Sequence, residues 1–323
     1  MPGNTTRTQI PAEVNAYYDR TLLMRVIPRF LYQKFAQVRD IPANSGTNII
    51  KFRRYGNLSA ATTPLSEGIT PVGSQASVTD ITCQTSQYGD YLLVTDVVQY
   101  ESPDATLTEF AQILGDQAGD TLDQITRDVL LAGTSVIYGG SAVSRVTVGA
   151  SDLITATMIL KAVRSLKNTK AMKITSMIGP NANIATTPLN ACFVGICHPN
   201  TGYTLKTLSG WIPVEKYPAQ KMVMDGEIGA LDEVRFIEST NAKIFTAAGA
   251  SGIDVYGTVI LGANAYGVTR ISGQTIRNIV KPLGSGGSTD PLDQRQTSGW
   301  KGTFAAKILN NDFLTRLEHA VAG

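Results

Sequence analysis

The residues best suited to metal binding or nucleophilic catalysis lie close together in the segment ACFVGICHP. It holds Cys192, Cys197 and His198, and the chain has one further histidine, His319. In an extended strand, positions 192 and 197 are an odd number of residues apart, so their side chains face opposite sides. A shared metal would need a sharp break between them, and the sequence has no second cysteine pair and no HExxH motif to add ligands. We interpret both cysteines as thiols of a buried strand and expect no metal, no cofactor and no catalytic residues.

Two glycine-rich segments and a row of acids raise the same question. GSGGS at 284–288 and GASG at 249–252 lack the lysine and the serine or threonine of a phosphate-binding loop, and neither fits GxSxG. We interpret them as turns or hinges. Asp116, Asp120 and Asp123 recur at steps of four and three, which places them on one exposed face of a helix. This spacing favours a solvated or interface-facing stripe over a catalytic set.

Basic residues gather in the first part of the chain. Residues 1–60 contain nine bases and three acids, a net charge of +6, whereas the whole chain carries +2, so the remainder carries −4. A basic leading segment suits a polyanion or an acidic neighbour. Arg53 and Arg54 beside Tyr55 are compatible with a nucleic-acid patch, with the exposed face of a strand, or with a salt bridge between subunits.

Length and composition set the scale of the molecule. With 323 residues, 43% hydrophobic and 17% charged, the chain is long enough for two domains or one large irregular one. The low charge content suggests that partners cover much of its surface. Three cysteines without a disulfide spacing indicate a reducing compartment. Because no apolar run has the length of a membrane span or a signal segment, we expect an aqueous, cytoplasmic setting.

The longest periodic segment is residues 106–132, which predict one long helix. Thr106 and Glu109 form a capping-box start, and Gly133 stands where a left-handed stop is expected. The apolar face comprises Leu107, Phe110, Ala111, Leu114, Ala118, Leu122, Ile125 and Val129. The opposite, polar face comprises Asp116, Asp120, Asp123, Gln124 and Arg127. We expect this helix to lie on a sheet and to act as the spine of the domain.

Residues before the spine helix predict an arm and a projection. Residues 12–37 are helical in pattern, with an interruption at Pro28, and carry more apolar area than so short a segment buries on itself. From residue 47 the period changes to two, which predicts strands at 48–55, 76–84 and 87–98. The intervening loop 56–75 is long and rich in Gly, Pro, Ser and Thr. An isolated hairpin is marginal in water, so we expect this projection to rest on a neighbour.

Residues after the spine helix predict a mixed domain of about 130 residues, a size typical of domains. Residues 152–167 form a second amphipathic helix pattern, and 191–197 read as a buried strand. We interpret 284–299 as a flexible connection. The segment from Trp300 has a turn at 310–312 between two strand-like runs, which we expect to return to the domain of the spine helix.

Several long motifs make the chain resemble the major capsid protein of tailed bacteriophages in the N4-like capsid family, which has the HK97-type fold. The motifs are IPAEVNAYYDRTLL, IKFRRYGNLSAATT, QYGDYLLVTDVV, AGDTLDQITRDVLLAGT, LDEVRFIEST, YGVTRISG, VKPLGSGGSTDPLDQRQTSGWK and ILNNDFLTRLEHA. The resemblance implies an α+β fold divided into an N-terminal arm at 1–46, an extended loop (E-loop) with flanking strands at 47–98, a peripheral (P) domain at 99–148, an axial (A) domain at 149–283, and a linker with C-terminal return strands to the peripheral domain at 284–323.

The resemblance also implies a function. Copies would form the pentamers and hexamers of an icosahedral shell around double-stranded DNA, in the virion, after assembly in the host bacterial cytoplasm and away from membranes. Separate scaffold, cement and portal proteins are further partners. Loop 56–75 has no lysine, which argues against a cross-link at its tip. An encapsulin-like compartment and a soluble α/β enzyme are the alternatives.

Two sets of residues follow from this interpretation. The candidates for contact between subunits are Tyr17, Phe30, Arg53, Arg54, Tyr55, Leu58, Leu65, Glu67 and Ile69. The candidates for DNA-facing bases are Arg20, Arg25, Arg29 and Lys34.

Overall fold

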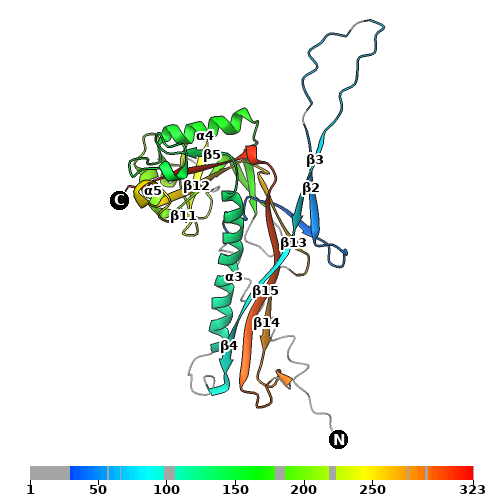
Figure 1. Cartoon of the computed structure of the whole chain (residues 1–323), viewed down its shortest axis with the longest axis vertical. Coiled ribbons are helices and arrows are strands. Elements are labelled where there is room, and N and C mark those ends of the chain that lie inside the picture. Colours follow the sequence, from blue (N-terminus) through cyan, green and yellow to red (C-terminus); the bar gives the residue numbers. More distant parts are fainter. Residues whose placement is uncertain are drawn as a thin grey trace.

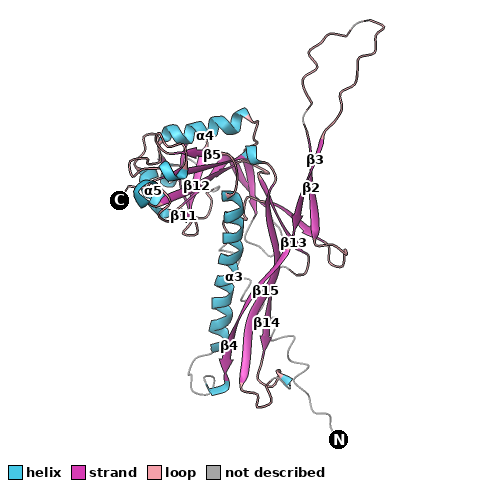
Figure 2. Cartoon of the chain, in the orientation of Figure 1, coloured by secondary structure: helices cyan, strands magenta, loops and turns pink. Residues whose placement is uncertain are grey.

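The computed structural model describes residues 30–56, 58–65, 67–97, 106–178, 186–217, 223–274, 276–287 and 290–322. Within them the chain is α+β and has three parts (Figure 1, Figure 2). The long helix α3 runs beside an elongated five-stranded sheet, a lobe is built on a nine-stranded sheet near one end of α3, and a two-stranded ribbon projects from the body.

Helix α3 spans Thr106–Leu131, close to the range that its periodicity predicts. Its face toward the sheet is buried at Leu114, Ala118 and Leu122, which pack with Trp300 and Phe304. The left-handed stop expected at Gly133 is wrong, since Gly133 does not adopt a positive φ. A Cβ at this position would lie 3.0 Å from Leu314 Cδ1, so glycine serves close packing where the chain leaves the helix.

The polar face of α3 differs from the prediction at two positions. Asp123 is 0% exposed and Arg127 is buried, whereas Gln124 is exposed and Asp116 and Asp120 are half-buried. The cause is tertiary, because backbone amides of residues 31 and 32 and the side chain of Asn241 cover this part of the helix.

The five-stranded sheet is organised around β15, Arg295–Ile308. Strands β4 and β14 pair with it antiparallel on opposite edges, and β13 pairs antiparallel with its final residues. Strand β1 completes the sheet by parallel pairing with β13. The four partners span Ser86–Thr95 for β4, Ile276–Lys281 for β14, Tyr266–Ile271 for β13 and Gln37–Ile41 for β1. Helix α3 covers one face of this sheet (Figure 1).

The nine-stranded sheet runs in the order β5-β16-β12-β7-β10-β9-β8, with β11 on β12 and β6 on β7. Its strands are β5 Val136–Tyr138, β6 Ile174–Ile178, β7 Thr186–Cys197, β8 Ile212–Pro213, β9 Glu227–Leu231, β10 Val234–Glu238, β11 Ile244–Phe245, β12 Val255–Leu261 and β16 Leu314–His319. Helices α4 (Ala156–Asn168) and α5 (Pro199–Lys206) pack on this lobe. Short 3-10 helices lie at η2 Arg145–Thr147, η3 Val214–Lys216, η5 Ala250–Gly252 and η7 Asn311–Phe313.

The two cysteines of β7 confirm the predicted strand geometry. Cys192 belongs to the core cluster that contains Tyr32 and Leu130, whereas Cys197 belongs to the cluster that contains α4. Both are buried free thiols, and burial raises the pKa of Cys192 to about 11. The nine-stranded sheet, which contains β7, therefore carries a separate apolar core on each face.

Several predicted boundaries are wrong. The segment 284–299 is not wholly a connection, because β15 begins at Arg295 and forms ladders on both edges. Strands β13 and β14 join the sheet of α3 although they fall inside the predicted 149–283 domain, and β16 joins the nine-stranded sheet rather than returning to α3.

Two helix predictions also need correction. Residues 30–36 form turns rather than helix, and residue 37 begins β1. Helix α4 begins at Ala156, not at 152, because Thr155 is its N-cap and accepts from the Met158 amide, while Leu153 forms a β-bridge with Ala320.

Candidate functional site

A projecting ribbon is the most exposed feature of the fold (Figure 1). It consists of β2 (Ile49–Tyr55), loop 56–77 and β3 (Val78–Gln84), and β2 and β3 pair antiparallel along their whole length. Its base is fixed to the body, since Phe52 and Cys83 are buried against Ala305. The predicted alternation in β2 is confirmed, because Phe52 is buried while Lys51, Arg53 and Tyr55 are exposed.

Beyond its base the ribbon is bare. Every described residue from 53 to 80 is exposed. The large apolar side chains there include Leu65 at 77% and Ile69 at 69% exposed, and Tyr55, Leu58 and Val72 are exposed in the same way. Glu67 stands between Leu65 and Ile69 and is exposed too. Apolar groups gathered on a two-stranded projection indicate a surface that another polypeptide covers.

The arginines of the ribbon have different settings. The Arg53 guanidinium donates to both carboxylate oxygens of Asp80, at 2.9 and 3.2 Å, across the β2–β3 ladder. This hydrogen bond lowers the pKa of Asp80. Of the three interpretations of Arg53, the exposed face of a strand is confirmed, whereas a salt bridge between subunits and a nucleic-acid patch stay predictions. The observed salt bridge lies within the chain, and because both side chains are solvent-accessible, it contributes little to stability. Arg54 is exposed and lines a depression of about 660 Å³ between the ribbon base and the turn near Asp312.

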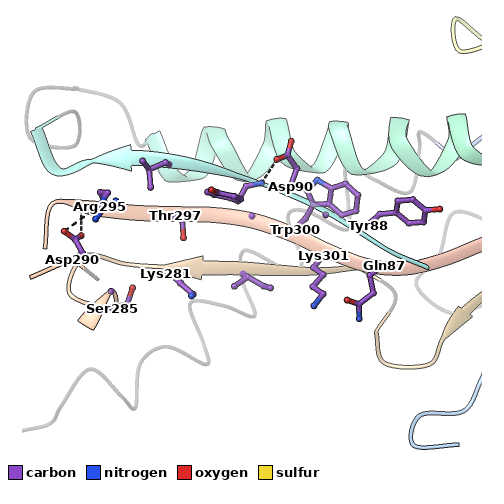
Figure 3. A pocket seen from close by; sticks show the side chains of 16 residues that line it. Gln87, Tyr88, Asp90, Lys281, Ser285, Asp290, Arg295, Thr297, Trp300 and Lys301 are labelled. Atoms are coloured by element: carbon purple, nitrogen blue, oxygen red, sulfur yellow. Dashed lines mark hydrogen bonds and ion pairs between the residues drawn. The ribbon is translucent and has the colours of Figure 1, made fainter. Parts of the chain in front are cut away.

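A second bare surface is the face of the β4–β15–β14 sheet that points away from α3. Antiparallel register places Tyr91, Gly299 and Ile279 in one row, and Leu93, Thr297 and Lys281 in the next. We call this surface the sheet groove; it encloses a volume of about 760 Å³ (Figure 3). Tyr91, Leu93 and Ile279 are exposed and form its apolar part, and Lys281 and Lys301 are exposed at its margins.

Glycine shapes the floor of the sheet groove. A Cβ at Gly299 would lie 2.8 Å from the Tyr91 Cβ and 2.9 Å from the Asp90 carbonyl oxygen, and one at Gly89 would lie 2.5 Å from the Trp300 carbonyl oxygen. The opposite side of the same strands is filled, because the Trp300 indole donates to Gln117 of α3 at 3.1 Å and Gln117 donates to Asp90 at 2.6 Å. The hydrogen bonds from Gln117 and the Tyr91 amide lower the pKa of Asp90. The groove is thus a concave apolar surface on a rigid support.

The arm candidates are only partly within the described residues. Tyr17, Arg20, Arg25 and Arg29 lie outside them. Phe30 packs on α3 and β15 of its own chain, beside Leu114 and Trp300. The Lys34 ammonium lies 3.5 Å from Asp225 Oδ2, so this base is directed toward an acid of its own chain.

Sequence reasoning found the ribbon but missed the sheet groove. The signal was present as alternation in YGDYLLV and TSGWKG, where glycine, aromatic and lysine side chains share one face. It was unreadable without the register, because only cross-strand pairing brings Tyr91, Gly299 and Ile279 into one row.

Two further features bear on function, namely metal-ligand clusters and membrane-spanning helices. Within the described residues, no group of three or more His, Cys, Asp or Glu side chains is close enough to hold a metal ion. No helix in the described part of the chain combines the length and apolar character needed to cross a membrane. His198 caps α5, where its Nδ1 accepts from the Asn200 amide at 3.2 Å, and burial lowers its pKa.

Several bacteriophage capsids of known structure have a similar fold. The capsid of Ralstonia phage GP4 has a TM-score of 0.70 at 12% identity and covers 91% of this chain and 89% of that chain. The capsid asymmetric unit of cyanophage Pam1 has a TM-score of 0.65 at 14% identity, and the match covers 93% of this chain and 92% of the Pam1 chain. The head of Helicobacter pylori bacteriophage KHP40 has a TM-score of 0.65 at 13% identity, and the match covers 91% of this chain and 90% of the KHP40 chain. The architecture is the HK97-type α+β capsid fold, as the sequence resemblance implied.

The sequence itself carries the family. The family model described as phage capsid protein matches residues 99–300, which is more than half of the chain. The chain therefore belongs to the phage capsid protein family. A curated relative, the major capsid protein of Pseudomonas phage KPP21, is 30% identical over 135 residues, and the match covers 40% of this chain and about a third (34%) of that relative. Membership of the N4-like group stays a prediction.

Proposed function

We propose that the protein is the major capsid protein of a tailed bacteriophage, whose copies assemble into pentamers and hexamers of an icosahedral head around double-stranded DNA. Family membership supports this role. The observation that carries it is the ribbon, whose described residues from 53 to 80 are exposed although they include Leu65, Ile69 and Val72. A chain that remained alone would keep this apolar surface in water.

The two sheets would belong to different domains of the shell protein. Helix α3 with the five-stranded sheet would form the peripheral domain, and the nine-stranded lobe would form the axial domain that meets its copies around the five-fold and six-fold axes. The role is structural: interfaces of about 1,600 Å² each, repeated over many copies, stabilise a closed particle without any single strong contact.

The ribbon and the sheet groove are complementary in chemistry. Leu65 and Ile69 offer apolar side chains on either side of the acidic Glu67. The groove offers an apolar centre at Tyr91 and Ile279 with ammonium groups at its margins. We infer that the ribbon of one copy lies in the sheet groove of the next, so that apolar burial supplies affinity and the Glu67 charge fixes the register.

Packaged DNA would meet the shell through charge rather than sequence. The basic residues Arg20, Arg25 and Arg29 of the arm are the candidates, whereas Lys34 already faces Asp225. Scaffold, cement and portal functions would come from separate proteins. The virion is the expected location of the mature shell, and the host cytoplasm the place of assembly.

Shortening the ribbon tests the proposal. In the variant, residues 58–75 are replaced by a short Gly-Ser turn, which leaves the pairing of β2 with β3 intact. Electron microscopy of the full chain should show closed particles, and the variant should remain unassembled at the same concentration with an unchanged melting temperature. Nuclease-resistant, genome-length DNA in particles from infected cells would distinguish a virion from a compartment for protein cargo. A wild-type chain that stays monomeric under every assembly condition, or a variant that assembles normally, would contradict the proposal.

A further inference from the structure

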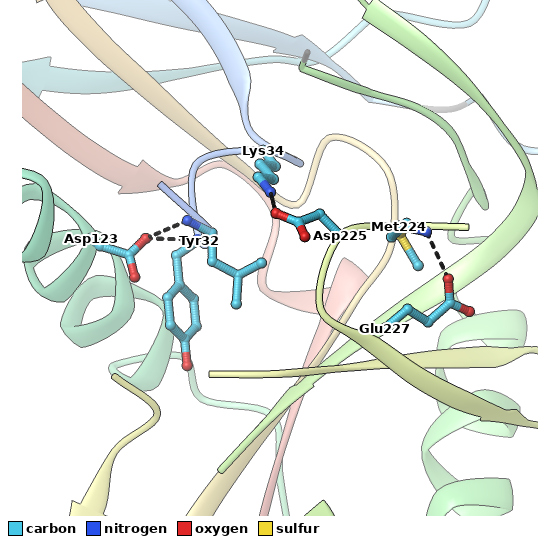
Figure 4. A network of polar contacts seen from close by, with 7 residues as sticks. Tyr32, Lys34, Asp123, Met224, Asp225 and Glu227 are labelled. Atoms are coloured by element: carbon cyan, nitrogen blue, oxygen red, sulfur yellow. Dashed lines mark hydrogen bonds and ion pairs between the residues drawn. The ribbon is translucent and has the colours of Figure 1, made fainter. Parts of the chain in front are cut away.

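In the segment that leads into β1, residues 30–36, two consecutive backbone amides bind one acidic side chain of α3. We call this segment the arm root. The Asp123 Oδ1 atom accepts hydrogen bonds from the backbone amides of Leu31 at 2.9 Å and Tyr32 at 2.8 Å (Figure 4). Tyr32 and Phe35 are buried in the core beneath α3, and the Tyr266 hydroxyl donates to the Tyr32 carbonyl. The root thus takes its backbone partners from side chains of α3 and β13 and from hydrogen bonds within its own turns.

Asp123 is a buried carboxyl without a counter-ion among the described residues. It is 0% exposed, and its Oδ2 accepts from the Asn241 side-chain amide at 3.3 Å. Arg127, one turn further along α3, donates to the Asn241 carbonyl at 2.7 Å and pairs with Asp128 at 2.9 Å instead. Within the described part of the chain, neutral N–H groups therefore stabilise the Asp123 charge, and a buried charge held in this way is costly.

The groups around this carboxyl explain how it titrates. Burial raises the pKa of Asp123 to about 6, against the lowering effect of its three N–H donors, and the nearby Asp120 adds to the rise. The phenols of Tyr32 and Tyr266 face it from the root and from β13, and burial raises the pKa of both. Two other titratable groups lie on the packed elements. Lys34, on the root, is directed toward Asp225 in the segment before β9, and Cys197 of β7 is a buried thiol.

We propose that Asp123 is the positioning residue of the arm root and that a proton taken up by its carboxyl tightens the root onto α3. When the proton binds Oδ2, Oδ1 still accepts from the Leu31 and Tyr32 amides. The new O–H donates to the side-chain oxygen of Asn241, whose amide turns over and gives up its 3.4 Å hydrogen bond to Asp120. When the root detaches, the carboxyl meets water and regains its ordinary proton affinity. Acid therefore favours attachment.

The direction and magnitude of the pH dependence of root attachment follow from proton linkage. The attached state binds the proton near pH 6 and the detached state near pH 3.8, so attachment weakens as the pH rises from about 4 to 6 and is constant above that. Between pH 4.5 and 7.5 the attachment constant should fall by about thirtyfold. The inference goes beyond the proposed shell function and does not rest on it, since root attachment is a property of a single chain.

Hydrogen–deuterium exchange of the full, unassembled chain tests it. The readout is the protection factor of a peptide spanning 30–36, corrected for intrinsic exchange, at pH values from 4.5 to 7.5, with the core peptide 192–197 as the reference for global unfolding. Wild type should lose about thirtyfold in protection across this range. Asp123→Asn keeps an oxygen acceptor but no titrating proton, so its protection should be independent of pH. The matched control Asp116→Asn, two turns earlier on α3, should retain the slope.

The outcomes separate the proposal from a purely structural role. A flat wild-type profile, a rise in protection with pH, or an unchanged slope in Asp123→Asn would overturn it. Should Asp123→Asn fail to fold, Asn241→Ala supplies the second test. Loss of this donor weakens the ionised form more than the protonated one, so the plateau should move to higher pH. An unmoved plateau in Asn241→Ala would also overturn the proposal.

Discussion

Replacing the two apolar side chains at the exposed end of the ribbon should block assembly without destabilising the chain. In the variant Leu65→Ser/Ile69→Ser, side chains that are 77% and 69% exposed in the single chain lose their apolar surface. Complete burial of such a side chain contributes about 1.5–3 kcal/mol, and roughly three quarters of that is still available to a neighbour. The pair should then weaken each ribbon contact by about 2–4 kcal/mol, or about thirtyfold to a thousandfold in its association constant.

Light scattering against protein concentration measures this loss as a rise in the threshold for assembly. The matched control is Thr62→Ser/Thr63→Ser, on the same exposed loop, which should leave the threshold unchanged. Thermal unfolding of the unassembled chains should agree within about 0.5 kcal/mol, because the altered residues contact solvent. An unchanged threshold, or a loss of stability in the single chain as large as the loss in assembly, would refute the reasoning.

Three further predictions concern particular charges. Glu318 is 0% exposed, accepts hydrogen bonds from the Arg145 guanidinium at 2.6 and 2.9 Å and forms an ion pair with Arg316 at 2.8 Å. Glu318→Gln should therefore lower the free energy of unfolding in urea by about 3–5 kcal/mol. Glu233→Gln, in the exposed pair with Lys167, should lower it by less than about 1 kcal/mol. Burial lowers the pKa of His319 to about 4, so its neutral form contributes stability that is lost as the pH falls from about 6.5 toward 4. Between pH 7.5 and 4.5, the free energy of unfolding of His319→Gln in urea should therefore rise by about 2–3 kcal/mol relative to that of wild type. An equal pH dependence in both proteins would contradict this. If Glu67 fixes the ribbon in the sheet groove, Glu67→Lys should raise the protein concentration needed for assembly. Adding Lys281→Glu to the same chain should restore the wild-type threshold concentration. A double variant that assembles no better than Glu67→Lys would place the glutamate elsewhere.

Local patterns in the sequence predicted those elements whose boundaries depend on nearby residues. Helix α3, the strands of the ribbon and the opposed cysteines of β7 follow from periodicity, because a side-chain period of 3.6 or 2 fixes which face is apolar. The long loop, predicted at 56–75 and observed at 56–77, could be recognised because its composition offers no core.

The errors arose where distant segments meet. Asp123 looked like a surface residue of α3, yet amides about ninety positions earlier cover it. Residues 295–299 looked like a continuation of a glycine-rich linker, yet pairing with β4 and β14 makes them strand. Tertiary partners override local propensity at such positions, and no short window of sequence contains them.

The central claim is that the ribbon of one copy lies in the sheet groove of another, and a disulfide placed between the two surfaces tests it most directly. The variant carries both Ile69→Cys and Ile279→Cys. Both of these positions are exposed, whereas the three native cysteines are buried. Oxidation of assembled particles, followed by denaturing gel electrophoresis, should give a ladder that ends at linked pentamers and hexamers, and neither single variant should give it. Closed particles that yield only unlinked chains would contradict the account.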